Sequence, residues 1–281
     1  MIISLRVIAS DPISSAWHKR SCRDQRGGIQ RFLSEMFPIR DSVPSRSVPV
    51  MTRTLILINI IVFFFELGLP QLSVVQLFYL FGVVPARFTH PEWAASVGFP
   101  IGTYWPLLTH QFLHGGWFHI LANMWTLWIF GDNVEDRMGP VRFIFFYLIC
   151  GVLAAVTQVL AIPDSTVPSV GASGAIAGIL GAYLLFFPTA RLIVLIPILF
   201  FPFFFELPAV IFLALWFFIQ LFSGTAMLAN PGQVGGIAFW AHVGGFIAGM
   251  FLCGFFVQRP TRRRMQPDEY GMEWGWEPRP R

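Results

Sequence analysis

Long apolar segments separated by short polar connections constrain this chain more than any other feature of its sequence. A helix needs about 20 apolar residues to cross a hydrocarbon core roughly 30 Å thick. The chain is 55% hydrophobic and only 12% charged, whereas soluble domains carry about 25% charged residues. The sequence therefore predicts a membrane protein built from transmembrane helices, with the lipid bilayer as its solvent.

Six apolar segments are candidates for membrane-spanning helices. One of them belongs to a very long apolar stretch, residues 192–222, which contains three prolines and is too long for one perpendicular helix. We expect its first part to form a cytoplasmic-side loop or a re-entrant segment. The pattern predicts an all-α fold, a six-helix transmembrane bundle. The expected spans are Leu55–Leu69, Trp117–Phe130, Phe143–Ile162, Gly171–Phe187, Leu207–Phe222 and Gly236–Val257.

The basic residues indicate the orientation of these helices, because cytoplasmic loops are enriched in Lys and Arg. We place both termini in the cytoplasm, together with the connections between the second and third spans and between the fourth and fifth spans. All of the 19 Lys and Arg residues except Arg87 then lie on the cytoplasmic side. We expect residues 1–50 to be a cytoplasmic basic tail, residues 51–258 the membrane domain and residues 259–281 a second cytoplasmic basic tail. Basic residues placed in this way encode topology, so nucleic acid is not an expected partner.

Two other features complete the outline of the chain. The first outer connection, residues 70–113, is rich in Pro, Gly and aromatic residues, and we expect a structured element at the outer interface, where Trp and Tyr concentrate. The three cysteines, Cys22, Cys150 and Cys253, have no CxxC spacing, so neither a disulfide framework nor a cysteine-based zinc site is expected.

Polar residues inside a membrane span are functional candidates by default. The second span contains His119 and Asn123, the fourth opens with Ser173 and the sixth contains His242. At 1.5 Å per residue, the Ser and the two His lie roughly 20–26 Å above the cytoplasmic boundary. Asn123 lies one turn below His119 on the same helix face. The sequence therefore predicts that these side chains share one layer in the outer half of the membrane.

Small residues accompany Ser173 and His242. Faces of this kind let helix backbones approach closely, as a hydrogen bond between Ser173 and His242 would require. Helix packing alone explains the glycines equally well, but it does not explain why a Ser and a His accompany them. The small positions are Gly171, Gly174, Gly178 and Gly181 in the fourth span and Gly245 and Gly249 in the sixth.

Ser173 and His242 have the chemistry of a nucleophile and its general base. The backbone N–H groups that begin the fourth span lack intrahelical partners, and together with His119 and Asn123 they suit an oxyanion hole. Glu66 lies at a matching depth, but bulky phenylalanines precede it and its Cα–Cβ bond tilts toward the cytoplasm. We expect Glu66 to reach toward the interface, which leaves a Ser-His dyad without an acidic third member and without a cofactor.

These residues resemble those of the rhomboid family of intramembrane serine proteases. The resemblance extends over roughly Met36 to Val257. The matching pieces are His110–His119 with Asn123, Gly131–Glu135 with Gly139 in a turn after the second span, Gly171–Gly174, and Ala241-His242 with Gly245 and Gly249.

The resemblance implies a bacterial-type serine endopeptidase that hydrolyses transmembrane protein substrates near the outer membrane face. It implies Ser173 as nucleophile, His242 as general base, and His119 and Asn123 with the Ser173 N–H as the oxyanion hole. It also implies a structural hydrogen-bonding role for Glu135, with the glycines of the two small faces as structural support. The compact six-span plan favours a multi-pass protein of a bacterial plasma membrane, and the Arg- and Ser-containing N-terminus leaves a transit peptide as an alternative.

Two details depart from the family pattern, and a separate observation concerns the beginning of the chain. Members often carry Trp-Arg in the outer loop, where this chain has Trp105-Pro106, so the loop must be anchored differently. Some members carry a Tyr at the position of Ala177, so other contacts must hold His242. Bacterial members often begin with a sequence like that at Met36, which makes residues 1–35 a candidate for a mis-assigned start.

Two alternatives stay open at this point. The first is a catalytically inactive rhomboid-like protein that binds membrane clients. The second is a metal site formed by His110, His114 and His119, although no acidic or Cys partner lies near them in the sequence. Neither the substrate nor the oligomeric state follows from the sequence.

Overall fold

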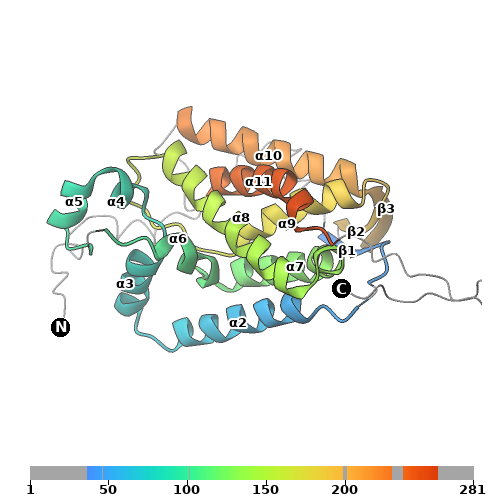
Figure 1. Ribbon diagram of the computed structural model, residues 1–281, viewed down its shortest axis with the longest axis horizontal. Helices are drawn as coiled ribbons and strands as arrows, with labels where there is room; N and C mark the ends of the chain where they lie inside the picture. Colours follow the sequence, from blue (N-terminus) through green and yellow to red (C-terminus); the bar gives the residue numbers. More distant parts are fainter. Residues whose placement is uncertain (1–36, 46, 101, 199–200, 230–236, 259–281) are drawn as a thin grey trace, which may run out of the picture.

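The computed structural model describes residues 37–45, 47–100, 102–198, 201–229 and 237–258. Long helices lie side by side along the molecule (Figure 1). Four of the described helices are long and apolar enough to cross a membrane, namely α2 (Val50–Leu67), α8 (Pro140–Ala161), α10 (Ala209–Ala229) and α11 (Phe239–Phe256). The molecule is therefore mostly helical, with the composition of an integral membrane protein.

Two further helices complete the bundle. Helix α7 (Trp117–Met138) continues past Phe130, through the residues expected to form a turn, and ends at Gly139, whose φ of 76° favours glycine. Helix α9 (Ser173–Phe186) has only 14 residues and lies inside the bundle, with residues 174–183 all buried. Six crossings and cytoplasmic termini remain predictions, and residues 1–36 of the first basic tail and the second basic tail, residues 259–281, lie outside the described residues.

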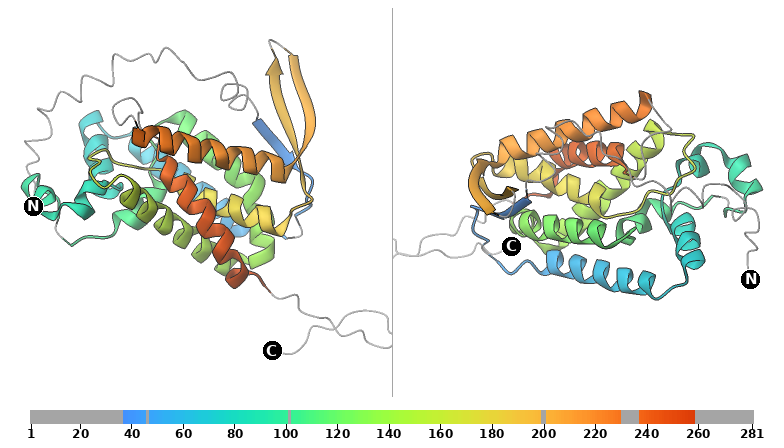
Figure 2. Two further views of the ribbon diagram at one scale, coloured as in Figure 1. Left: turned by 90° about the horizontal axis from the view of Figure 1, so that it is seen from above. Right: turned by 180° about the vertical axis from the view of Figure 1, so that it is seen from behind.

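A three-stranded antiparallel sheet corrects the all-α prediction. Strands β2 (Arg191–Ile198) and β3 (Phe201–Pro208) form a hairpin in place of the expected loop or re-entrant segment, and β1 (Phe37–Asp41) pairs with β2. The hairpin crosses the direction of α10 at the end of the bundle opposite α3–α6 (Figure 2). Its prolines disfavour a helix, and its β-branched and Phe residues favour strands.

Strand β1 lies within residues 1–50, which the sequence analysis expected to form a tail. The Asp41 carboxylate accepts hydrogen bonds from the Asn133 amide at 2.7 Å and from the Tyr183 hydroxyl at 2.6 Å. Burial raises the pKa of Asp41 above its ordinary value of 3.8. Residues 37–41 are thus fastened to α7 and α9 and do not form part of a free tail.

Glu135 makes the structural hydrogen bonds that hold α2 against α7. Its buried carboxylate accepts bonds from the backbone N–H of Met51 at 2.9 Å and from both the N–H and the hydroxyl of Thr52 at 2.8 Å each. The first N–H groups of a helix lack intrahelical partners and attract negative charge. Glu135 therefore stabilises the beginning of α2.

The outer connection folds into short helices at the opposite end of the molecule from the sheet (Figure 1). Arg87, the basic residue outside the predicted cytoplasmic set, is buried there; its guanidinium donates to the Leu80 carbonyl at 3.0 Å and lies 4.9 Å from the Phe99 ring centre. The Trp105 indole donates to the same carbonyl at 3.3 Å. Arg87 thus anchors this loop, which lacks the family's Trp-Arg pair. The helices are α3 (Gln71–Phe81), α4 (Pro85–Thr89), α5 (Pro91–Ser96), α6 (Pro106–Thr109) and η3 (His110–Phe112).

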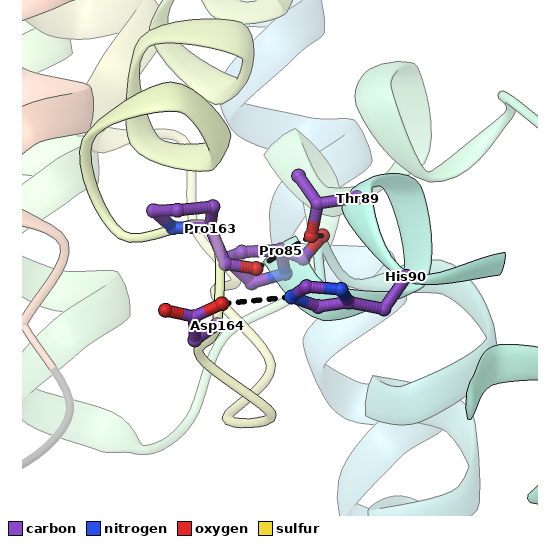
Figure 3. A network of polar contacts seen from close by, with 5 residues as sticks. All are labelled: Pro85, Thr89, His90, Pro163 and Asp164. Atoms are coloured by element: carbon purple, nitrogen blue, oxygen red, sulfur yellow. Dashed lines mark hydrogen bonds and ion pairs between the residues drawn. The ribbon is translucent and has the colours of Figure 1, made fainter. Parts of the chain in front are cut away.

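The outer connection is fastened to the segment between α8 and α9. Val83 and Ser169 exchange backbone hydrogen bonds of 2.9 and 2.8 Å. Close by, Thr89 donates to the Pro163 carbonyl at 2.6 Å and His90 contacts Asp164 at 2.7 Å (Figure 3). These contacts fix the segment that leads into Ser173.

Candidate active site

Ser173 is the first residue of α9 and is half-buried. The preceding turn positions it: Gly171 has a φ of 127°, which favours glycine, and its N–H donates to the His110 carbonyl at 2.8 Å. Because Ser173 begins the helix, its own N–H has no intrahelical acceptor. A nucleophile candidate and a free backbone donor thus occupy the same position.

His242 lies in the first turn of α11, with its side chain directed at α9. Its Nε2 atom lies 2.8 Å from the Ser173 hydroxyl oxygen. The backbone N–H of Ala241, next to it, donates to the buried Gln158 side chain of α8 at 3.0 Å. The Ser-to-His distance lies within the range of a nucleophile–base hydrogen bond.

The small residues allow this approach. A Cβ added at Gly249 would lie 2.6 Å from the Cα of Gly178, and one added at Gly245 would collide with the carbonyl oxygen of Gly174. A Cβ added at Gly174 would lie 2.7 Å from that of Ala154 on α8. Any larger side chain at these positions would separate α11 from α9 or α9 from α8. The glycines therefore set the spacing on which the Ser173–His242 contact depends.

His119 and Asn123 lie against the turn that precedes Ser173. A Cβ added at Gly171 would lie 2.6 Å from His119 Nε2 and 3.6 Å from Asn123 Nδ2. His119 is half-buried and Asn123 is buried. Their polar groups thus surround the backbone at the beginning of α9, where an oxyanion formed at Ser173 would need donors.

Glu66 does not reach toward the interface as the sequence analysis expected. It is only 3% exposed, and its carboxylate oxygens lie 3.2 and 3.3 Å from the backbone nitrogen of His114. The expectation failed because the outer connection folds over the end of α2, which sequence position alone does not reveal. Glu66 makes no hydrogen bond to His242 among the contacts of the described residues.

His114 links this outer connection to the site. Its Nε2 atom lies 3.1 Å from Asn123 Nδ2, and its ring centre lies 5.1 Å from that of His119. His110 instead directs Nδ1 at the Pro106 carbonyl, 2.9 Å away. Within the described ranges, no group of three or more His, Cys, Asp or Glu side chains is arranged to hold a metal ion. The three-histidine metal site therefore finds no support there.

Gln220 is a polar residue of the site that the sequence analysis did not single out. It lies on α10, is 8% exposed, and its Oε1 atom lies 2.8 Å from His242 Nδ1. One turn earlier, the ring of Trp216 lies 5.9 Å from the His242 ring at an interplanar angle of 35°. The rule that treats polar residues inside spans as functional candidates would have found Gln220.

The fold and this site define a class of protein. It is a polytopic membrane protein whose apolar helices hold a serine and a histidine together near the beginnings of two helices. A family model described as the Rhomboid domain matches residues 102–259, more than half of the chain. The chain therefore belongs to the rhomboid family, as the resemblance of its motifs indicated.

Three curated relatives illustrate the range of the family. RHOMBOID-like protein 5 of Arabidopsis thaliana is 31% identical over 166 residues, 59% of this chain and 48% of the relative. Rhomboid protease GluP of Bacillus subtilis is 42% identical over 83 residues, 30% and 16% respectively. The mitochondrial presenilin-associated rhomboid-like protein of Bos taurus is 31% identical over 153 residues, 52% and 36% respectively. The chain spans less than half the length of each of these relatives.

Proposed function

We propose that this protein is an intramembrane serine endopeptidase that cleaves transmembrane protein substrates near the outer membrane face. The observation that carries the proposal is the 2.8 Å contact between the Ser173 hydroxyl and His242 Nε2. Membership of a family that includes serine proteases supports it. The proposal includes six membrane crossings with cytoplasmic termini, and residence in a bacterial plasma membrane.

In the proposed reaction, Ser173 attacks a substrate carbonyl carbon while His242 Nε2 takes the hydroxyl proton. The carbonyl oxygen becomes an oxyanion, which the Ser173 N–H, His119 and Asn123 stabilise by donating hydrogen bonds. His242 then gives its proton to the leaving amine, and the peptide bond breaks to form an acyl-enzyme. Water, deprotonated by the same imidazole, releases the second product and regenerates Ser173.

The substrate must present an extended backbone to this site, because an intact helix buries its carbonyl groups in its own hydrogen bonds. Half-buried Ser173, His119 and His242 leave access for a chain of this kind. We expect substrates with helix-weakening Gly or Pro near the outer boundary to be cleaved faster than a span made only of Leu. Equal rates for the two would contradict this part of the proposal.

The test is reconstitution of the purified protein in liposomes with a fluorescently labelled transmembrane substrate. The wild type should cleave the substrate and react with a fluorophosphonate probe, and Ser173→Ala should lose both activities, with cleavage falling by about 1,000-fold or more. The Ser173→Ala protein should keep its thermal stability, since the change removes one half-buried hydroxyl. A wild type that binds substrates but neither cleaves them nor reacts with the probe would favour the client-binding alternative.

A further inference from the structure

The imidazole of His242 is held at both nitrogen atoms, and only one of the contacts belongs to the proposed dyad. Nε2 faces Ser173 at 2.8 Å, and Nδ1 faces Gln220 Oε1, also at 2.8 Å. Gln220 comes from a different helix, α10, which packs beside α11. The histidine therefore lies between a side chain of α9 and a side chain of α10.

The chemistry of these contacts determines where the proton of neutral His242 resides. In the structure, Gln220 Oε1 faces Nδ1, and because a carbonyl oxygen can only accept a hydrogen bond, this orientation of the amide assigns the hydrogen to Nδ1. Nε2 is then left with a lone pair directed at the Ser173 hydroxyl. This is the tautomer in which histidine can accept the proton of serine.

The surroundings of Gln220 indicate that its hydrogen bond is specific. The side chain is 8% exposed, and a buried amide is costly unless it is hydrogen-bonded. The ring centre of Trp216, one turn earlier on α10, lies 5.9 Å from that of the imidazole and 6.0 Å from that of Phe246. This ring contact and the Gln220 hydrogen bond restrict both the tilt and the rotation of His242.

We propose that Gln220 is a positioning residue of the active site, which holds His242 in the tautomer and orientation that activate Ser173. This inference rests on the proposed function, because it assigns a role in the same reaction. It also accounts for the absence of a tyrosine at Ala177: in this chain the histidine is held from α10. A neutral amide fulfils the role without placing a charge in the membrane interior.

Two substitutions at one position test the role. Gln220→Met keeps an unbranched side chain of similar length but removes the acceptor oxygen. We expect kcat to fall about 10- to 100-fold, with KM within about twofold of the wild-type value, as for loss of one buried hydrogen bond. Gln220→Glu keeps an acceptor at the same reach and should recover most of the lost kcat. Phe218→Leu, a lipid-side change on the same helix, should leave kcat unchanged.

The rate of fluorophosphonate labelling separates this inference from the proposed function. Wild-type labelling that disappears in Ser173→Ala establishes the nucleophile independently of Gln220, and labelling of Gln220→Met should be slower in proportion to kcat. A Gln220→Met protein with wild-type kcat and labelling rate would overturn the positioning role and leave the protease proposal intact. A wild type that neither cleaves substrate nor reacts with the probe would overturn both.

Loss of folding is a separate possibility that thermal unfolding detects. If Gln220→Met does not fold, Gln220→Asn replaces it, because its amide is one methylene too short to reach Nδ1. A folded Gln220→Asn protein with low kcat and unchanged KM supports the role. One with the wild-type kcat overturns it.

Discussion

The Gly249→Ala substitution adds one methyl group between α9 and α11 and should change the spacing of these helices. An added Cβ would lie 2.6 Å from the Cα of Gly178, whereas ordinary contacts begin at 3.4 Å. The backbone carbonyl oxygen of Gly178 would lie closer still, so the helices must separate by more than about 0.8 Å. Gly249 lies seven residues beyond His242, about 10 Å along the helix, so the methyl group does not touch the site.

The separation of the two helices would also lengthen the contact between Ser173 and His242. If α11 moves as a unit, the Ser173–His242 distance increases from 2.8 Å to more than about 3.6 Å, beyond the range of a hydrogen bond. We expect kcat to fall by about 100-fold, the usual cost of a 1 Å misplacement of catalytic groups. Overpacking of this kind should also lower the free energy of unfolding by about 1–3 kcal/mol.

Gly254→Ala provides the matched control, because a Cβ at that position meets nothing within 4 Å. It makes the same chemical change on the same helix, and it should keep full activity and gain stability from the better helix propensity of alanine. Both variants can be compared with the wild type by substrate cleavage in liposomes and by thermal unfolding in detergent. Full activity and unchanged stability of Gly249→Ala would refute the spacing argument.

The remaining predictions concern the carboxylates. Asp41→Asn keeps acceptors for its partners, so it should match or exceed wild-type stability, while Asp41→Ala should lose about 1–3 kcal/mol. Because burial raises the pKa of Asp41, the folded state binds the Asp41 proton more tightly than the unfolded state does. The unfolding temperature of the wild type should therefore rise relative to that of Asp41→Asn as the pH falls toward 4. A relative fall of the wild-type unfolding temperature would contradict this. Glu135→Ala should lower the unfolding temperature clearly, by loss of two buried hydrogen bonds and one part-buried hydrogen bond. Glu66→Gln should cleave substrate within about tenfold of wild type, as for one weakened hydrogen bond; inactivity equal to that of Ser173→Ala would make Glu66 part of the catalytic group.

Hydrophobicity alone determined where most of the helices lie. Apolar runs of sufficient length predicted α2, α8 and α11 closely, because a membrane helix must satisfy its backbone internally over a fixed thickness. The apolar run that contains β2 and β3 was misassigned for the same reason. Hydrophobicity does not distinguish a strand from a helix or a loop, and the strands are defined by the pairing of β2 with β3 along their length and of β1 with β2.

The candidate site likewise combines features that the sequence determined with features that only the structure decided. The sequence by itself determined which residue types share a membrane depth, since helical rise and apolar length place Ser173 and His242 on one level without any knowledge of their neighbours. Only the tertiary structure decided which side chains meet there: Gln220 with His242, and Glu66 with the backbone of His114. Depth is a property of each helix, whereas the rotation of a helix about its axis and the identity of its neighbours depend on packing with all the others.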